Sequence, residues 1–384
     1  MKTEGENENK IEIEIKDETK VRTYPLFRHP LLQAHAIVVN GRIKTESKGA
    51  ISCIPAVRSA LEMIDGQFPA LAGEQLCIST WMPPVPSNAF QRLAQSQIKS
   101  ALGKRTPDQV TISITENCPN SCVHCALPDS GQGLRLEPDT VMDIISQILD
   151  LGTTLVIFDG GEPTTYKELP ELVASVDERA ISTLFTSGAG FSESLARRLK
   201  DAGLYAVNVS LDSPVPEEHD SIRGRVGVFR DAMKAIEYAK QAGILVNLYV
   251  VLQPENMRHL ERFHLLAKVM GVHELTFFEV VPVGRWSGRT DVGLSPADRA
   301  ALDCLTSRAE PPRIFSVPAA RMRFGCFAGR TWMHVTPTGE VYPCACMPRS
   351  LGNIFQEPVA KIWQKMGSLP FKGSKTCPMQ KAKV

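Results

Sequence analysis

The chain has 384 residues, with 43 Lys and Arg against 42 Asp and Glu, so its formal net charge is +1. This balance argues against a protein that binds nucleic acid mainly by electrostatic attraction. The longest apolar stretch, Ile244 to Leu252, is far shorter than the roughly 20 residues of a membrane-spanning helix, so we expect no membrane span. The N-terminal sequence MKTEGENENK lacks the apolar segment of a signal peptide, which predicts a cytoplasmic protein with reduced cysteines.

The first part of the chain is predicted to hold a charged tail and a small α+β extension. Residues 1–20 carry seven acidic and four basic side chains, which is typical of a disordered, solvated tail. Residues 21–105 are predicted to form an N-terminal domain with a hairpin over 36–44 that turns at Asn40-Gly41, and with helices over 54–63 and 90–99. The pattern assigns this domain no role.

Residues 106–310 alternate short β-branched runs with helical segments. The predicted strands are 110–115, 155–158, 183–186, 206–211, 246–252 and 275–280, and the predicted helices are about 137–150, 167–178, 192–202, 227–242 and 256–270. Repeated right-handed crossovers of this kind produce a parallel sheet in an α/β fold, either doubly wound or curled toward a barrel. In barrels of this kind the reactive groups lie at the carboxyl ends of the strands.

Three cysteines occupy the loop after the first of these strands, in the sequence ENCPNSCVHCALPDSG. Cys118, Cys122 and Cys125 have the spacing C-x3-C-x2-C. Three thiolates can hold three irons of a [4Fe–4S] cube and leave the fourth iron without a protein ligand. Structural zinc prefers four ligands, and neighbouring His124 and Cys125 make awkward joint ligands. We favour the cluster over zinc, and zinc over ordinary buried thiols.

This motif resembles the signature of the radical S-adenosylmethionine (SAM) superfamily, and later motifs of residues 106–310 match in the same order. They include Gly160-Gly161-Glu162-Pro163 after the second strand and the segment HDSIRG, which ends at Gly224. The resemblance implies a partial (βα)6 barrel, similar to a TIM barrel. It also implies a SAM site formed by Gly160, Gly161, Glu162, Pro163, Ser187, Ser210, Asp212, Arg223 and Val250.

The residue types suit such a site. Paired glycines let the backbone approach a ligand closely, a carboxylate such as Glu162 can accept an ammonium group, and the planar fork of Arg223 can bind a carboxylate with two hydrogen bonds. The resemblance implies that SAM binds the open iron and is cleaved to a 5′-deoxyadenosyl radical, which removes hydrogen from a C–H bond. Relatives receive the electron from ferredoxin or flavodoxin.

The alternation stops near residue 311, and residues 311–384 are predicted to form a small C-terminal domain with a second group of cysteines. Cys326, Cys344, Cys346 and Cys377 lie there, and a turn at Thr338-Gly339 would bring Cys326 and Cys344 together. The segment resembles the SPASM and twitch domains, which carry auxiliary [4Fe–4S] clusters. It has fewer cysteines than a full SPASM domain, so we expect one cluster. Cys346 is either its fourth ligand or a bystander, and zinc is the alternative for the group.

The combined pattern predicts a radical SAM enzyme of an oxidoreductase or bond-forming type that acts on a cofactor-like or other small molecule. A peptide-modifying enzyme is the first alternative. A non-enzymatic iron–sulfur electron carrier is the second, although a carrier would not need the SAM motifs. Cys53, Cys77 and Cys304 lie in apolar or helical contexts and are interpreted as buried, inert thiols.

Overall fold

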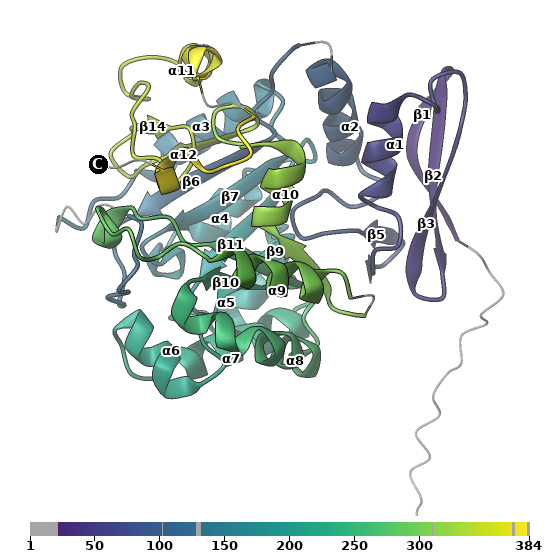
Figure 1. Cartoon of the computed structure of the whole chain (residues 1–384). Coiled ribbons are helices and arrows are strands. Elements are labelled where there is room, and N and C mark those ends of the chain that lie inside the picture. Colours follow the sequence, from purple (N-terminus) through teal and green to yellow (C-terminus); the bar gives the residue numbers. More distant parts are fainter. Residues whose placement is uncertain (1–21, 102, 128–131, 309, 371–372, 382–384) are drawn as a thin grey trace, which may run out of the picture.

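The computed structural model describes residues 22–101, 103–127, 132–308, 310–370 and 373–381 (Figure 1). The strands are β1 (Thr23–His29), β2 (Leu32–Val39), β3 (Arg42–Lys48), β4 (Ala70–Ala72), β5 (Gln75–Cys77), β6 (Gln109–Thr115), β7 (Leu155–Gly160), β8 (Ile181–Thr186), β9 (Ala206–Ser210), β10 (Leu245–Leu252), β11 (Glu274–Glu279), β12 (Arg313–Ser316), β13 (Trp332–Val335) and β14 (Val341–Tyr342). The helices are α1 (Pro55–Glu62), α2 (Asn88–Ala101), α3 (Pro138–Asp150), α4 (Leu169–Ala174), α5 (Glu193–Asp201), α6 (Pro216–Arg223), α7 (Val228–Gln241), α8 (Leu260–Met270), α9 (Pro296–Thr306), α10 (Val317–Phe324), α11 (Val359–Lys365) and α12 (Pro378–Lys381). The tail predicted over residues 1–20 lies outside the described residues.

A nine-stranded sheet forms the centre of the molecule, in the order β12-β11-β10-β9-β8-β7-β6-β13-β14. All neighbours from β6 to β12 pair in parallel, and the sheet stays open rather than closing into a full barrel. Helices α3 to α9 connect these strands. The predicted α/β partial barrel and its six strands are therefore confirmed.

The structure adds a seventh parallel strand, β12, which begins beyond the boundary that we predicted near residue 310. Its four residues, Arg313–Ser316, follow Pro311-Pro312, and the first three are only partly buried, so their sequence carries little strand pattern. The C-terminal region joins the other edge of the sheet. There β13 pairs in parallel with β6 and antiparallel with β14, which brings the second cysteine group beside the barrel.

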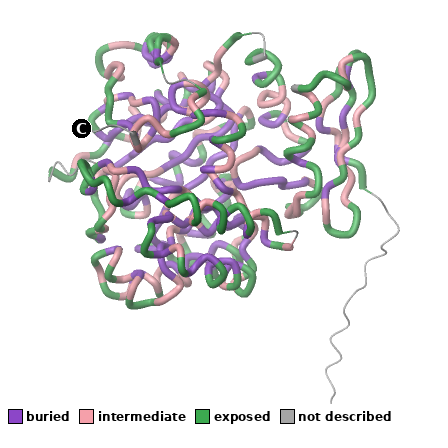
Figure 2. Tube along the Cα trace, viewed as in Figure 1, coloured by how far each residue is buried: buried purple, intermediate pink, exposed green. Residues whose placement is uncertain are grey.

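The main core lies between the sheet and its helices, and Figure 2 shows this buried layer running through the strands. Strands β6 to β11 are buried along most of their length because helices cover one face and the opposite face lines the barrel interior. In the described part of the chain, no helix is long and apolar enough to cross a membrane.

The N-terminal extension has its own small core. Strands β1, β2 and β3 form an antiparallel sheet beside the barrel (Figure 1), and Tyr24, Ile43 and Phe90 pack between this sheet and α2. The predicted hairpin turn is confirmed, since Asn40 and Gly41 both have positive φ angles, of 51° and 73°.

One prediction about the isolated cysteines was partly wrong. Cys77 is buried as expected, but Cys53 and Cys304 are exposed. Cys53 lies in the turn before α1, and Cys304 lies on the outer face of α9. Apolar neighbours in the sequence did not indicate burial, because the side chains of a helix point to several sides.

Candidate active site at the carboxyl ends of the strands

The loop that carries Cys118, Cys122 and Cys125 is held by three other loops that approach it closely. A Cβ atom added to Gly161 or Gly224 would collide with backbone atoms of this loop or of the two residues before it. The same holds for Gly284, whose added Cβ would meet the carbonyl oxygen of Cys125. Only glycine permits these contacts, so the glycines that end β7 and α6 set the shape of the cysteine loop.

The three thiols fit an iron–sulfur cube better than a single ion. All three border one cavity of about 610 Å³. Burial is the largest cause that raises the pKa of Cys118, to about 11, and the nearby Cys122 and Cys125 raise it further. Within the described ranges, no group of three or more His, Cys, Asp or Glu side chains is arranged to hold one metal ion. Three neighbouring thiols around a larger space suit a cluster.

Glu162 is 1% exposed and accepts several hydrogen bonds within the protein. Its carboxylate accepts from Thr186 Oγ1 at 2.7 Å, from Ser187 N at 2.8 Å and from Ser187 Oγ at 2.6 Å, and it also accepts from Thr164. Burial is the main cause that raises its pKa, and these donors oppose the shift. Glu162 borders the cavity together with Gly160, Gly161, Pro163 and Ser187, so the structure brings these five predicted SAM-site residues together.

Asp212 and Arg223 form a buried ion pair beneath the cysteine loop. Arg223 Nη2 lies 2.7 Å from Asp212 Oδ2, and Arg223 Nη1 lies 3.8 Å from Cys122 Sγ. Burial disfavours the charged guanidinium, but Asp212 and Cys122 more than offset this and raise the pKa of Arg223. His124 Nε2 lies 3.4 Å from the same carboxylate, a contact that the sequence analysis missed. Arg223 borders the cavity, whereas Asp212 supports it from behind.

On β10, the structure brings Val251 rather than Val250 to the cavity wall. Val250 is 0% exposed and belongs to the main core, whereas Tyr249 and Val251 line the cavity. Successive side chains of a strand point to opposite faces, so the neighbours Val250 and Val251 face the core and the cavity respectively. Ser210, at the end of β9, borders the same cavity.

The second cysteine group is assembled around a shared apolar cluster. Cys326, Cys344 and Cys346 pack together there, and Cys377 lies near enough for its charge to raise the pKa of Cys344 and Cys346. Burial is the largest cause of the raised pKa in both thiols. Together with the charges of Cys377 and Asp159, burial raises the pKa of Cys346 to about 12. Of these four cysteines, Cys346 is the one that borders the cavity of the first group.

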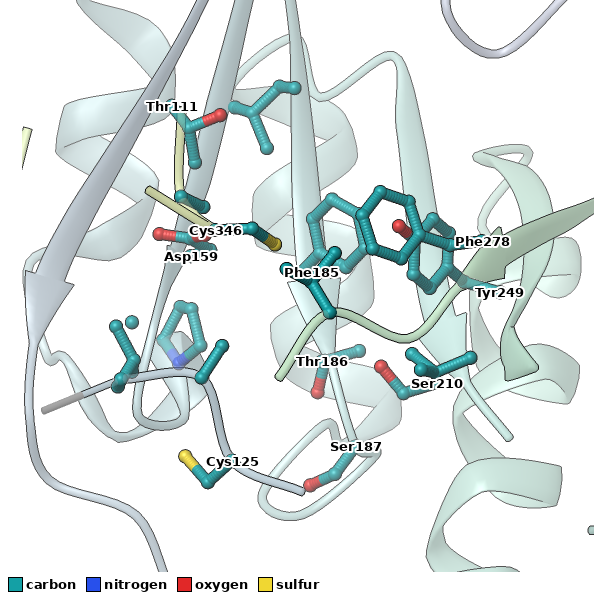
Figure 3. A pocket seen from close by; sticks show the side chains of 18 of the residues that line it. Thr111, Cys125, Asp159, Phe185, Thr186, Ser187, Ser210, Tyr249, Phe278 and Cys346 are labelled. Carbon is teal, nitrogen blue, oxygen red and sulfur yellow. The ribbon is translucent and has the colours of Figure 1, made fainter. Parts of the chain in front are cut away.

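The inner wall of the cavity contains residues to which the sequence analysis gave no role. Figure 3 shows Asp159 beside Cys346, with Phe185, Tyr249 and Phe278 across from them. Asp159, Phe185, Tyr249 and Phe278 lie on strands, so alternation could have assigned each of them to one of two faces, but long-range packing decides which face lines the interior. Burial raises the pKa of Asp159 to about 7, although a hydrogen bond from Ser113 Oγ opposes the shift.

A parallel partial barrel with three thiols on its first loop, and with Cys346 of a second cysteine group on the same cavity, is the scaffold of an iron–sulfur enzyme. Comparison with known families agrees. The Radical SAM superfamily model matches residues 112–267, and the model of the SPASM iron–sulfur cluster-binding domain matches residues 326–380. The chain belongs to the SPASM-containing radical SAM enzymes, which implies that it binds [4Fe–4S] clusters and SAM.

Relatives of known name differ in their substrates. The chain is 24% identical over 297 residues to the AdoMet-dependent heme synthase of Nitratidesulfovibrio vulgaris. This alignment covers 68% of this chain and 80% of the heme synthase. The chain is also 27% identical over 277 residues to the PqqA peptide cyclase of Granulibacter bethesdensis. This alignment covers 67% of this chain and 74% of the cyclase. The fold is similar to Streptococcus suis SuiB bound to S-adenosylmethionine, with a TM-score of 0.57 and 17% identity over 71% of this chain and 70% of SuiB.

Proposed function

We propose that this enzyme oxidises a cofactor precursor or another small molecule that binds between its two cysteine groups. One observation carries the proposal: a single cavity is bordered by Cys118, Cys122 and Cys125 and also by Cys346. A substrate in this cavity would lie within reach of both groups. When bound, the clusters and SAM supply the electrons and the 5′-deoxyadenosyl radical for hydrogen removal.

The residues of the chain then have defined tasks. Cys118, Cys122 and Cys125 would ligate the first cluster, and Cys326, Cys344 and Cys377 the auxiliary cluster, with Cys346 facing the substrate side. Gly160, Gly161, Glu162, Pro163, Ser187, Ser210 and Arg223 border the cavity and are placed to bind SAM. The enclosed barrel interior would exclude water from the radical.

A net oxidation would remove one hydrogen atom, then one electron and one proton, from the substrate. Bound SAM would supply the acceptor of the hydrogen atom and the auxiliary cluster the acceptor of the electron. The proton would pass to a base of the chain. Asp159 is placed for this last step, since it lines the cavity beside Cys346 and only one of its carboxylate oxygens has a hydrogen bond given by the described residues. The electron that starts each cycle would come from ferredoxin or flavodoxin.

The small-molecule proposal is supported by similarity to heme synthases and to an Fe-coproporphyrin III synthase from Methanosarcina barkeri, which is 30% identical over 203 residues. Peptide modification is the second candidate. It is favoured by the similarity to PqqA peptide cyclases, which cover the same share of this chain as the heme synthases.

The test is anaerobic turnover of reconstituted enzyme with dithionite and SAM. We expect 5′-deoxyadenosine to form, and we expect the spectrum of the auxiliary cluster to show reduction in a single turnover with the correct substrate. Fe-coproporphyrin III and a peptide are the first two candidates to compare by product mass. Absence of 5′-deoxyadenosine despite an intact first cluster would favour an electron carrier instead.

A further inference from the structure

A segment of the N-terminal extension closes the end of the barrel opposite the cysteine loop. Residues 77–82 begin at the last residue of β5 and lie across the amino-terminal ends of β8 to β11. Cys77 packs on the first residues of β9 and β10, Ala206 and Leu245, and the Tyr205 hydroxyl donates to the Ser79 carbonyl at 3.3 Å. The extension is therefore attached to the barrel at the floor of its interior.

Buried polar contacts hold this segment in place. Glu274, the first residue of β11, is 1% exposed and accepts from Thr80 N at 2.7 Å, from Thr80 Oγ1 at 2.6 Å and from Ser79 Oγ at 3.0 Å. Arg313 of β12 pairs with the same carboxylate. Because the carboxylate is satisfied from both sides, the segment is bound by charge-assisted hydrogen bonds rather than by loose apolar contact.

Trp81, at the end of this segment, points into the barrel and is held by a chain of hydrogen bonds. Its indole Nε1 donates to Thr276 Oγ1 at 3.1 Å, and Thr276 Oγ1 donates to Asn247 Oδ1 at 3.0 Å. Asn247 Nδ2 in turn donates to Asn208 Oδ1 at 2.8 Å. The chain crosses β11, β10 and β9 and fixes the orientation of the indole plane.

The fixed indole belongs to an aromatic floor, which we define as Trp81, Phe185, Tyr249 and Phe315. The ring centroid of Trp81 lies 6.0 Å from Phe185, 6.2 Å from Tyr249 and 6.4 Å from Phe315. Phe185 and Tyr249 meet edge to face, with centroids 4.8 Å apart. All four side chains line the cavity that Cys118, Cys122, Cys125 and Cys346 border. Rings arranged in this way offer faces and edges to a further ring.

We propose that the N-terminal extension completes the substrate site, and that Trp81 is a specificity-determining residue which selects a substrate with a flat aromatic ring. This inference rests on the proposed function, because it places the substrate in the same cavity. The ring could belong to a free small molecule or to an aromatic side chain of a peptide. In either case it would lie against the aromatic floor, with its reacting carbon toward the SAM end.

The experiment measures binding by equilibrium dialysis, under anoxic conditions, on holoprotein with both clusters and SAM. The probe is p-cresol, and 4-methylcyclohexanol, which has the same skeleton without the flat ring, is the matched ligand control. We expect p-cresol to bind wild-type protein more tightly than 4-methylcyclohexanol. Trp81→Ala should weaken p-cresol binding by about fivefold, the amount typical of one lost aromatic pair.

Two further variants separate recognition from structural damage. Trp81→Phe keeps a ring and should bind p-cresol within about twofold of wild type. Phe355→Ala removes an aromatic side chain that is 65% exposed and not part of the cavity wall, and it should leave binding unchanged. The capped tripeptide Gly-Tyr-Gly tests the second source of the ring, and tighter binding than p-cresol would favour a peptide substrate.

Equal affinity for p-cresol and 4-methylcyclohexanol would overturn the proposal, as would equal p-cresol binding by wild type and Trp81→Ala. Failure of p-cresol to bind the wild-type holoprotein would also overturn it. Formation of 5′-deoxyadenosine by the wild-type preparation is measured in parallel. If no 5′-deoxyadenosine forms while p-cresol still binds in a way that depends on Trp81, the proposed reaction is wrong, but the proposal that Trp81 selects an aromatic ring is retained.

Discussion

Arg223 and Asp212 are joined at 2.7 Å in a site where both side chains are almost fully buried, at 10% and 1% exposure. The arginine comes from the end of α6 and the aspartate from the loop after β9, so the pair fixes the fold of the segment between β9 and α6, within one βα unit, below the cysteine loop. Because Arg223 also contacts Cys122, the pair links the shape of the barrel to the position of a thiol.

We expect Asp212→Ala to lower the free energy of unfolding of the apoprotein by about 3–5 kcal/mol, because it leaves the Arg223 guanidinium buried without its carboxylate. Urea unfolding followed by circular dichroism measures the change. Asp291→Ala is the matched control, since Asp291 pairs with Arg289 at the surface, and it should have little effect. Equal midpoints for Asp212→Ala and Asp291→Ala would contradict this prediction.

Cys122→Ala should abolish 5′-deoxyadenosine formation, because a cube held by two thiolates should not be stable. The product is measured by mass spectrometry after anaerobic reconstitution with dithionite and SAM. Cys304→Ala, which removes an exposed thiol on α9, should keep wild-type activity. Normal turnover in Cys122→Ala would show that the C-x3-C-x2-C loop does not hold the SAM-binding cluster.

Cys326→Ala should lower the iron content by about one cluster and still permit SAM cleavage, as expected for a ligand of a separate cube. Cys326 is buried with Cys344 and does not border the cavity of the first group. Iron analysis and 5′-deoxyadenosine yield are compared with those of Cys53→Ala, which alters an exposed thiol. Unchanged iron in Cys326→Ala would remove the auxiliary-cluster assignment.

Asp159→Asn should change how stability depends on pH. Burial raises the pKa of Asp159 from 3.8 to about 7, so the folded protein favours the neutral acid. Between about pH 4 and pH 7 the folded state binds more protons at this group than the unfolded state, and stability falls as pH rises. Asparagine stays neutral, so the variant should avoid this loss.

The urea midpoints of wild type and Asp159→Asn at pH 5 and pH 8 test this difference. We expect the variant to gain stability relative to wild type on the order of 1–2 kcal/mol at the higher pH. This is less than the full shift implies, because Asp159 borders the cavity and its side chain is only partly buried. Other buried acids titrate equally in both proteins and cancel. Parallel pH profiles for the two proteins would exclude a raised pKa at Asp159.

Local patterns in the chain were enough to predict the alternating strands and helices, the Asn40-Gly41 turn and the two cysteine groups. Each of these depends on residues that are close in the sequence. The β-branched runs specify buried strands because both faces are covered, and paired asparagine and glycine permit the positive φ angles of a tight turn. Gly160-Gly161-Glu162-Pro163 also reached the cavity where its position after a strand predicted it.

The positions of Val251, Asp159 and Trp81 in the cavity wall depended on long-range packing. Whether Val250 or Val251 faces inward depends on the register of β10 between β9 and β11, which no local pattern specifies. Trp81 reaches the barrel through contacts such as that of Glu274, 193 residues further along the chain, with the backbone and side chain of Thr80. Contacts between such distant residues form only when the whole chain packs together. The grouping of Cys118, Cys122 and Cys125 could therefore be predicted from their spacing, whereas the aromatic floor of the cavity could not.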